Sequence, residues 1–305
     1  MTGQRGILII HNPQAGGGRR RIVEDVRRAC VALGAEVESR ATRCPGDAET
    51  LACEGAGEGF GTVVAAGGDG TVNEVLNGLM RVAPGAARPA MALLPAGTVN
   101  VLAAELELPR EPAASAAMLV AGRRRRIDVG RANDRFFVSC AGVGADAAAV
   151  ARVSLPLKRM VGRGAYAAAA VHALALEAGR LFGVEIGGER VEASALLATN
   201  IKRYAGPCLV APAALLDDGL LDVVLARSGG RAAWFRYGLH LLFGTLRQAP
   251  GLMHLQTRRI TVADPPGLPV QVDGDIRTNT PVSIEIIPAA LELVVPATMP
   301  VAEAP

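Results

Sequence analysis

Residues 67–71, which read GGDGT, combine three glycines with a carboxylate and a hydroxyl. They follow an apolar run at 62–66 and precede side chains that recur at helical spacing from Val72, with Thr71 as the expected N-cap. The first N–H groups of a helix attract anions, and glycines let the backbone approach closely, so this turn is typical of a phosphate site. Asp69 would repel a phosphate directly, so we expect it to organise a bridging Mg²⁺. The stretch predicts a nucleotide triphosphate site, and a tight strand-to-helix turn without a ligand is the alternative.

Two acidic turns could also do chemistry. The first, VDGD at 272–275, places Asp273 and Asp275 one residue apart. One carboxylate could accept the proton of an attacking hydroxyl while the other orients the metal or the substrate. The same four residues are also typical of a simple hairpin turn. The second, at Asp217 and Asp218, is either a cation site or an ordinary turn before a strand.

The elements that must position these residues fall into two groups. In the first, helices alternate with strands, which are expected at 6–11, 35–41, 62–66 and 89–94. This alternation predicts an α/β domain with a doubly wound parallel sheet, whose ligands bind at the carboxyl ends of the strands. Beyond residue 126, strands are expected at 135–139, 181–186, 195–200, 219–226, 258–262, 269–272 and 282–287, with helices at 165–178 and 231–247. These predict a mainly antiparallel β-sandwich domain.

The composition narrows the class of protein. The 305 residues are 50% apolar but only 3% aromatic, and the formal net charge of +3 gives no argument for nucleic acid binding. The five cysteines form no CxxC pair, and the start of the chain is polar, so we expect a cytoplasmic protein. The longest apolar run, 165–176, is too short to span a membrane. Any membrane contact is expected to be peripheral, at the inner face.

Six motifs in order resemble the diacylglycerol kinase catalytic family, in particular soluble bacterial lipid kinases related to sphingosine kinases. They are NP…GG at 12–17, GGDGTVNE at 67–74, PAGTVN at 95–100, GVGAD at 142–146, DDGLLD at 217–222 and VDGD at 272–275. The resemblance covers nearly the whole chain. It implies a phosphofructokinase-like ATP-binding domain at 1–125, to which residues from about 288 to 305 return, and a β-sandwich domain for the lipid substrate at 126–287.

The resemblance also implies roles for individual residues. Asp275 takes the place of a glutamate that accepts the proton, with Asp273 as its partner. A structural divalent cation is implied at Asp218, with the main-chain carbonyls of Leu215 and Leu220. The nucleotide is implied to contact Asn12, Thr42, Gly68, Asp69, Gly70, Thr71, Val72, Asn73, Glu74 and Thr98.

The expected function is that of a lipid kinase, which transfers the γ-phosphate of ATP to a hydroxyl of a diacylglycerol-like or related lipid. Mg²⁺ is the expected metal, with Ca²⁺ as an alternative at the structural site. The shared GGDGT turn leaves an NAD kinase open. Val101 and Ala104 replace an aspartate and an arginine common in relatives, which leaves a non-catalytic nucleotide- or lipid-binding protein open.

The acceptor side of the reaction has one sequence signal. Four aromatic residues lie within 234–243 of an expected helix that is apolar around most of its circumference. This helix is either buried or forms a lip, including Trp234 and Phe235, that contacts acyl chains or the bilayer. The expected partners are ATP, a lipid with a free hydroxyl and, transiently, the membrane surface. A homodimer is left open.

Overall fold

The computed structural model describes residues 5–13, 17–83, 86–97, 100–145, 147–148, 181–204, 208–227 and 229–297. The helix expected at 165–178 lies outside these residues. The chain divides into two compact units, formed by residues 1–127 with 289–305 and by residues 128–288. The chain passes from one unit to the other within β5 (Arg123–Ala132) and again within β18 (Val282–Val295).

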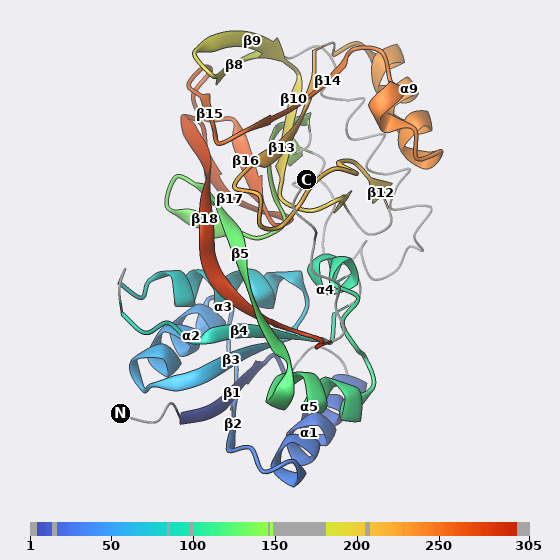
Figure 1. Cartoon of the computed structure of the whole chain (residues 1–305). Helices are drawn as coiled ribbons and strands as arrows, with labels where there is room; N and C mark the ends of the chain where they lie inside the picture. The colour runs from blue at the N-terminus through green and yellow to red at the C-terminus, as the bar shows by residue number, and fades with distance from the viewer. Residues whose placement is uncertain are drawn as a thin grey trace. The chain divides into compact units, whose positions relative to one another are not determined.

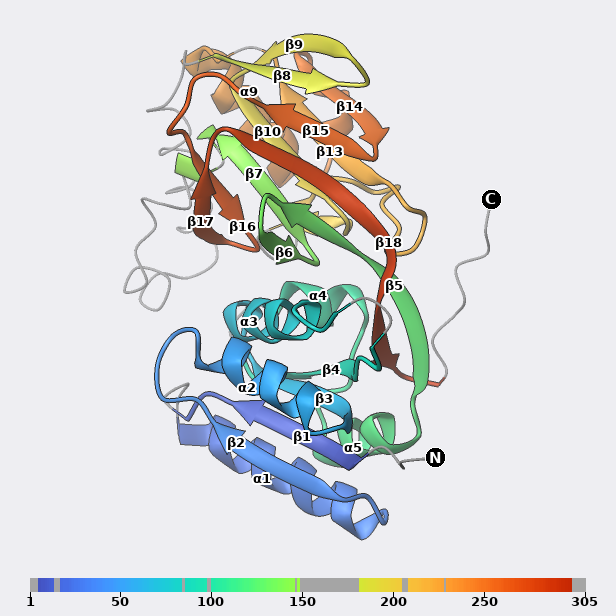
Figure 2. The same ribbon diagram turned by 90° about the vertical axis from the view of Figure 1, so that its left-hand side faces the viewer.

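The first unit is a parallel sheet with helices on both faces (Figure 1, Figure 2). Helices α2 (Asp47–Gly57) and α3 (Asp69–Met80) lie on one face, and α1 (Gly17–Ala32) and α5 (Pro112–Ala121) lie on the other. The strand order is β2-β1-β3-β4, and the end of β18 pairs with β4. The strands are β1 (Arg5–His11), β2 (Val37–Ala41), β3 (Phe60–Gly67) and β4 (Ala90–Pro95). The predicted α/β fold class is confirmed.

Local sequence explains two features of this sheet. Strand β3 is buried along its whole length, as its continuous apolar sequence predicts for a strand covered on both faces. Helix α3 begins at Asp69 with Gly68 as its N-cap, so the expectation that Thr71 caps a helix beginning at Val72 is wrong. The reason is that Asp69 takes the first helical position, where the helix dipole favours a carboxylate.

The second unit contains two layers of mostly antiparallel strands. One layer is a six-stranded sheet in the order β14-β13-β10-β7-β16-β17. Its strands are β7 (Cys140–Gly144), β10 (Ala195–Thr199), β13 (Leu221–Ala226), β14 (Leu252–Thr257), β16 (Pro269–Val272) and β17 (Asp275–Asn279). The other layer contains β6 (Arg135–Phe137), β8 (Phe182–Ile186), β9 (Glu189–Ala193), β15 (Arg259–Val262) and the first part of β18.

The core of the second unit lies between these two layers. Val143, Leu196 and Val270 from the six-stranded sheet join one buried apolar cluster with Val184 and Ile260 from the other layer. Most of these strands contribute alternate side chains to this core, which is the pattern of a sandwich. The predicted, mainly antiparallel β-sandwich is therefore confirmed.

Helix α9 (Arg231–Leu242) and the short 3₁₀ helix η1 (Leu246–Gln248) lie where one helix was expected at 231–247. Gly244, with φ of 67°, separates them. Strands β11 (Arg203–Tyr204) and β12 (Cys208–Leu209) form a small ladder, and α4 (Val101–Glu105) follows β4 in the first unit. Within the described ranges, no helix is long and apolar enough to cross a membrane.

Candidate functional site

The carboxyl ends of the parallel strands lie in register at one edge of the first unit. His11, at the end of β1, is aligned with Ala41 of β2 and with Ala66 of β3. Gly67 of β3 is aligned in turn with Pro95 of β4. Neighbouring strands are about 4.8 Å apart, so the loops that leave them emerge side by side. This is the edge at which a parallel α/β sheet binds its ligands.

Several predicted nucleotide-binding residues lie at this edge. Asn12 follows β1 directly, Thr42 follows β2, and Gly68 follows β3. The N–H of Thr42 donates a hydrogen bond of 2.8 Å to the carbonyl of His11, which joins the first two loops. The structure therefore brings Asn12, Thr42 and the turn at 67–71 together. Thr98 lies outside the described residues.

The turn after β3 lies directly against the turn after β4. The N–H of Ala96 donates to the carbonyl of Gly67 at 3.0 Å. A Cβ atom on Gly97 would lie 2.5 Å from the Cα of Gly68, so residue 97 has no room for a side chain. A Cβ on Gly68 would have more room, because its nearest contact is the Gly97 Cα at 3.5 Å. Two glycine turns thus meet at the N-terminus of α3.

Asp69 ties these two turns together. Its Oδ1 accepts a hydrogen bond of 2.8 Å from the backbone N–H of Val101. Asn100, in a left-handed conformation, closes the second turn by accepting from the Gly97 N–H at 3.0 Å and donating to the Gly97 carbonyl at 2.8 Å. The hydrogen bond to Asp69 is donated by the main-chain N–H of residue 101. It therefore does not depend on the side chain, and it forms although valine stands where relatives often have aspartate.

Asn73 and Glu74 lie further along α3 and contribute to its packing. Glu74 accepts a hydrogen bond of 3.2 Å from the N–H of Ala48 in the first turn of α2. Asn73 is buried, and its carbonyl accepts a bond of 2.8 Å from the side chain of Asn77. These bonds hold the helix that carries the 67–71 turn. Contact of either side chain with a nucleotide stays a prediction.

The acidic turn at 272–275 is a tight hairpin between β16 and β17. Val272 pairs with Asp275 across the ladder, and Asp273 and Gly274 have φ values of 48° and 86°. Two consecutive left-handed residues are what a two-residue hairpin requires, and Asp-Gly is a favoured sequence for them. The N–H of Gly274 donates to Oε1 of the fully buried Gln271 at 2.8 Å. The hairpin interpretation is thus correct for the backbone.

The two carboxylates of this hairpin have different surroundings. Asp273 accepts three main-chain hydrogen bonds, from Val138 at 3.2 Å, Ser139 at 2.9 Å and Cys140 at 3.0 Å. These bonds anchor the hairpin to the chain that leads into β7. The side chain of Asp275 is half-exposed and accepts a bond of 2.9 Å from Arg277. Asp273 is held by the backbone, whereas Asp275 is accessible to a substrate.

Asp218 lies in a second group of carboxylates. Its Oδ1 accepts from the Leu220 N–H at 2.9 Å, and Oδ2 of the buried Asp128 accepts from the Gly219 N–H at 2.6 Å. Burial raises the pKa of the Asp218 carboxyl, and the charges of Asp128 and Asp217 raise it further. A bound cation would relieve the cost of ionising these groups.

The predicted cation ligands lie close together in the sequence. Leu215, Asp218 and Leu220 all lie in the segment that precedes β13. Within the described part of the chain, no group of three or more His, Cys, Asp and Glu side chains has the arrangement of a metal site. The predicted site, with one carboxylate and two carbonyls, differs in kind and stays a prediction. Sequence reasoning missed Asp128, whose signal was a lone acid in the apolar segment Ile127-Asp128-Val129.

An apolar cavity of about 120 Å³ lies in the second unit, between α9 and the six-stranded sheet. Trp234 and Tyr237 of α9 are buried beside it and pack edge to face, with ring centroids 5.4 Å apart. Phe235, in contrast, is 64% exposed. The helix thus has a buried face and an apolar exposed face. The cavity is lined by Ala195, Leu196, Leu197, Val210, Val224, Ala226, Trp234, Tyr237, Gly238, Leu241, Leu246 and Leu252.

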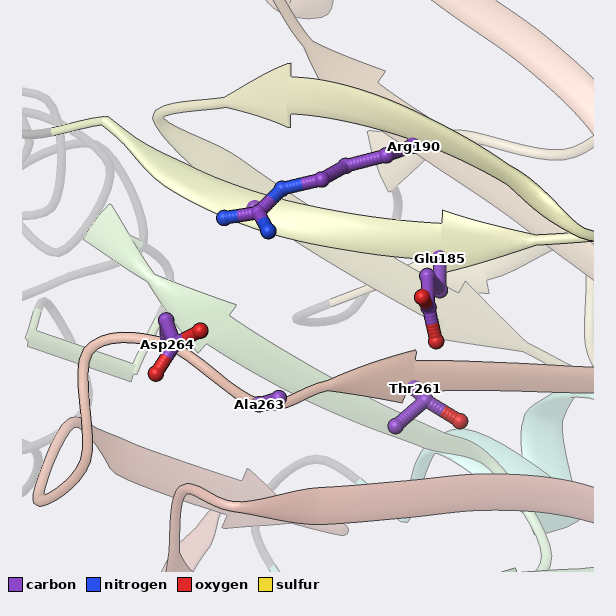
Figure 3. Close-up of a pocket in the computed structure, with 6 residues that line it drawn as sticks. Glu185, Arg190, Thr261, Ala263 and Asp264 are labelled. Carbon is purple, nitrogen blue, oxygen red and sulfur yellow. The ribbon is translucent and has the colours of Figure 1, made fainter.

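A second hollow, of about 30 Å³, lies between β8, β9 and the end of β15. Figure 3 shows Arg190 extending along β8, with Glu185 on the same strand pair and Asp264 on the loop after β15. The hollow has space for about one or two water molecules, too little for a nucleotide or an acyl chain. Its side chains carry both signs of charge, and we assign it no role.

Comparison with known proteins decides the family. The profile of the diacylglycerol kinase catalytic domain matches residues 6–132, and that of the YegS C-terminal NAD kinase beta sandwich-like domain matches residues 139–295. A diacylglycerol kinase of Bacillus subtilis is 31% identical over 271 residues, which cover 88% of each chain. The chain belongs to the diacylglycerol kinase catalytic family. The predicted resemblance is confirmed.

Other members of the diacylglycerol kinase catalytic family agree in length and fold. A probable YegS-like lipid kinase of Chromohalobacter salexigens is 33% identical over 285 residues, which cover 91% of this chain and 88% of the relative. A solved structure of a putative diacylglycerol kinase of Bacillus anthracis has a TM-score of 0.80 at 22% identity, with 98% of each chain covered, and shows the same fold. The protein is therefore a lipid kinase, as predicted, and its family implies ATP and a lipid as substrates.

Proposed function

We propose that this lipid kinase transfers the γ-phosphoryl group of ATP to a hydroxyl group of a diacylglycerol-like lipid. The observation that carries the proposal is the meeting of the two glycine turns at the N-terminus of α3, with Asp69 bonded between them. A helix N-terminus without side chains in front of it suits the phosphates of a nucleotide. The names of relatives, among them diacylglycerol kinase, support the choice of acceptor.

In this proposal the residues of the first unit bind and orient the nucleotide. Main-chain N–H groups of Gly68, Gly70 and Thr71 bind phosphate oxygens, and Asn12 and Thr42 extend the same edge. Asp69 holds Mg²⁺, which, when bound, neutralises charge on the phosphates. The residues fit this role because Asp69 is fixed by Val101 in the loop that faces the turn.

Asp275 is the proposed proton acceptor for the lipid hydroxyl. Its carboxylate is half-exposed at the first position of β17, and Arg277 holds one of its oxygens. The proton of the attacking hydroxyl passes to this carboxylate as the bond from the lipid oxygen to the γ-phosphorus forms and the bond from that phosphorus to the β,γ-bridging oxygen breaks, which releases ADP. Asp273 positions the hairpin through its three main-chain bonds and does not itself take up the proton.

The apolar cavity beneath α9 supports a lipid acceptor. A dry apolar cavity of about 150 Å³ in another protein binds benzene, so a cavity of comparable size can hold part of an acyl chain. Its wall is almost entirely hydrocarbon, which favours chain length over head group as the recognised feature. A transient contact with the membrane surface would deliver such a lipid.

The turn around Asp218 is the proposed site of a structural cation, Mg²⁺ or Ca²⁺. The pKa of the Asp218 carboxyl is raised, which means that its ionised form is unfavourable in the folded protein until a cation binds. We expect either ion to raise the melting temperature of the wild type at neutral pH, and to raise that of Asp218→Asn less. Equal shifts in the melting temperature of both proteins would contradict a cation site at Asp218.

The test of the proposed function is a transfer assay with radiolabelled ATP. Detergent-dispersed diacylglycerol, monoacylglycerol, sphingosine and NAD serve as separate acceptors, and the product is identified by mass. We expect a phosphorylated diacylglycerol-like lipid with wild type and with the control Asp264→Asn, which replaces an exposed carboxylate elsewhere in the second unit. Labelled NADP alone, or no labelled product with any lipid, would contradict the proposal.

A further inference from the structure

The outer face of α9 carries an exposed apolar stripe. Phe235, Leu239 and Phe243 are 64%, 40% and 77% exposed. Phe235 and Leu239 lie on α9 and Phe243 is its C-cap residue, so their spacing of four residues places them along one side of the helix. Phe235 and Phe243 are the two aromatic residues among the exposed large apolar side chains of the described residues. Burying such side chains away from water is favourable, so the stripe is typical of a binding surface.

The chain around this stripe carries only positive charge. From Val223 to Thr257 the sequence contains no Asp or Glu, but it contains four arginines and two histidines. With 29 acidic residues in 305, a stretch of this length would carry about three on average. Arg236 and Arg247 are exposed on α9 and η1. An anionic surface is therefore the complementary partner.

The helix is also the wall of the apolar cavity. Its opposite face, with Trp234, Tyr237 and Gly238, lines the cavity, so one helix presents apolar side chains both outward and inward. Arg236 lies over the ring of Tyr237 at 5.8 Å and donates to the carbonyl of Pro250 at 3.0 Å, which keeps its charge at the edge of the stripe. Exposed aromatic side chains beside arginines are the two kinds of group that bind at a bilayer interface, the first among the acyl chains and the second at the anionic head groups.

We propose that α9 docks this kinase on an anionic lipid bilayer, with Phe235, Leu239 and Phe243 inserted among the acyl chains and the arginines against the head groups. This inference rests on the proposed function, since a lipid acceptor must be drawn from a bilayer. It replaces the expectation that Trp234 and Phe235 act together as a lip. Trp234 belongs to the core, and the inserted residues follow the exposed side of the helix.

The experiment is sedimentation of the full-length protein with vesicles in the absence of nucleotide. Wild type, Phe235→Glu and Phe243→Glu are compared on phosphatidylcholine vesicles with and without phosphatidylglycerol. We expect wild type to bind the anionic vesicles, more weakly at high salt, and each variant to bind at least about tenfold more weakly. Both positions are exposed, so the variants should keep the melting temperature of the wild type within about 2 °C.

The matched control is Leu33→Glu, which replaces an apolar side chain that is 54% exposed at the end of α1 in the first unit. It should bind vesicles as wild type does. The proposal is overturned if wild type does not sediment with anionic vesicles, if the α9 variants bind as wild type, or if the control loses binding equally. It is also overturned if the stripe proves to be a dimer contact, with dimeric wild type and monomeric variants in light scattering. Kinase activity on detergent-dispersed lipid, measured in parallel, separates failure of docking from failure of the proposed function.

Discussion

Two short turns, one in each unit, hold their carboxylates in different ways. In the 67–71 turn, Asp69 begins a helix and accepts a main-chain bond from Val101 in the facing turn, beside glycines that leave the backbone uncovered. In the 272–275 turn, Asp273 accepts three main-chain bonds, while Asp275 is half-exposed beside Arg277. The residue type is the same, but in the proposed function one turn presents main-chain donors to a phosphate and the other presents an acceptor to a proton. Each substitution below tests one side of this contrast.

The largest effect is expected for Asp275→Asn. The amide keeps the size of the side chain but cannot accept a proton, so turnover should fall by about 10²- to 10⁴-fold. The measurement is the initial rate of labelled phosphate transfer, with ATP binding and the melting temperature determined in parallel. Both should be unchanged. Near-normal turnover would contradict the assignment of Asp275 as the proton acceptor.

Asp273→Asn is expected mainly to lower the stability of the protein. Asparagine tolerates the left-handed conformation, but it loses the charge and one acceptor oxygen, so some of the three main-chain donors lose their partner. The expected cost is about 1–3 kcal/mol, or several degrees in melting temperature. Denaturant unfolding of Asp273→Asn and Asp275→Asn side by side is the check. A fully stable Asp273→Asn protein without turnover would reverse the roles assigned to the two residues.

Substitutions of two glycines in the first unit distinguish an effect on stability from an effect on nucleotide binding. Gly97→Ala pushes a methyl group onto the Gly68 backbone and should cost about 1–3 kcal/mol and weaken ATP binding. Gly68→Ala meets only an ordinary contact in the structure, so it should cost less than about 1 kcal/mol while it still obstructs a phosphate. Calorimetric titration with ATP and thermal unfolding of both variants measure this. Normal ATP binding by a stable Gly68→Ala protein would contradict a phosphate site at this turn.

The smallest effect is expected for a carboxylate with a purely structural role. Glu285 on β18 contacts Arg259 at 3.1 Å and also Arg131, and these arginines hold the pKa of its carboxyl below the ordinary value. A lowered pKa means that the stabilisation is present above the unfolded value, about 4.5, and is lost as the pH falls through the folded pKa.

Glu285→Gln should therefore reduce the free energy of unfolding by about 1 kcal/mol at neutral pH and by progressively less in acid. Thermal unfolding as a function of pH is the measurement. Glu292→Gln is the control, because Glu292 meets Arg124 and Arg126 only at 3.4 Å and should show a smaller loss. A difference from wild type that grows in acid would contradict the role of Glu285.

The sequence predicted most of the described strands, and several of those that it missed have a physical reason. β9, β14 and β17 lie at sheet edges, where polar side chains face water and the apolar alternation is weak. β7 is central but reads CAGVG, and glycine has a low strand propensity. Their pairing depends on partners that are distant in the chain.

The sequence by itself determined the fold class, because periodicity and turn chemistry are local properties of the chain, and the resemblance of its six ordered motifs indicated the family. The resemblance implied different roles for Asp275 and Asp273, but only the tertiary structure showed how their surroundings differ, since the three donors to Asp273 lie more than 130 residues away. It likewise placed Trp234 in the core and Phe235 on the surface, although the two are neighbours. Which side of an element is covered depends on what packs against it, and the chain acquires that information only when it folds.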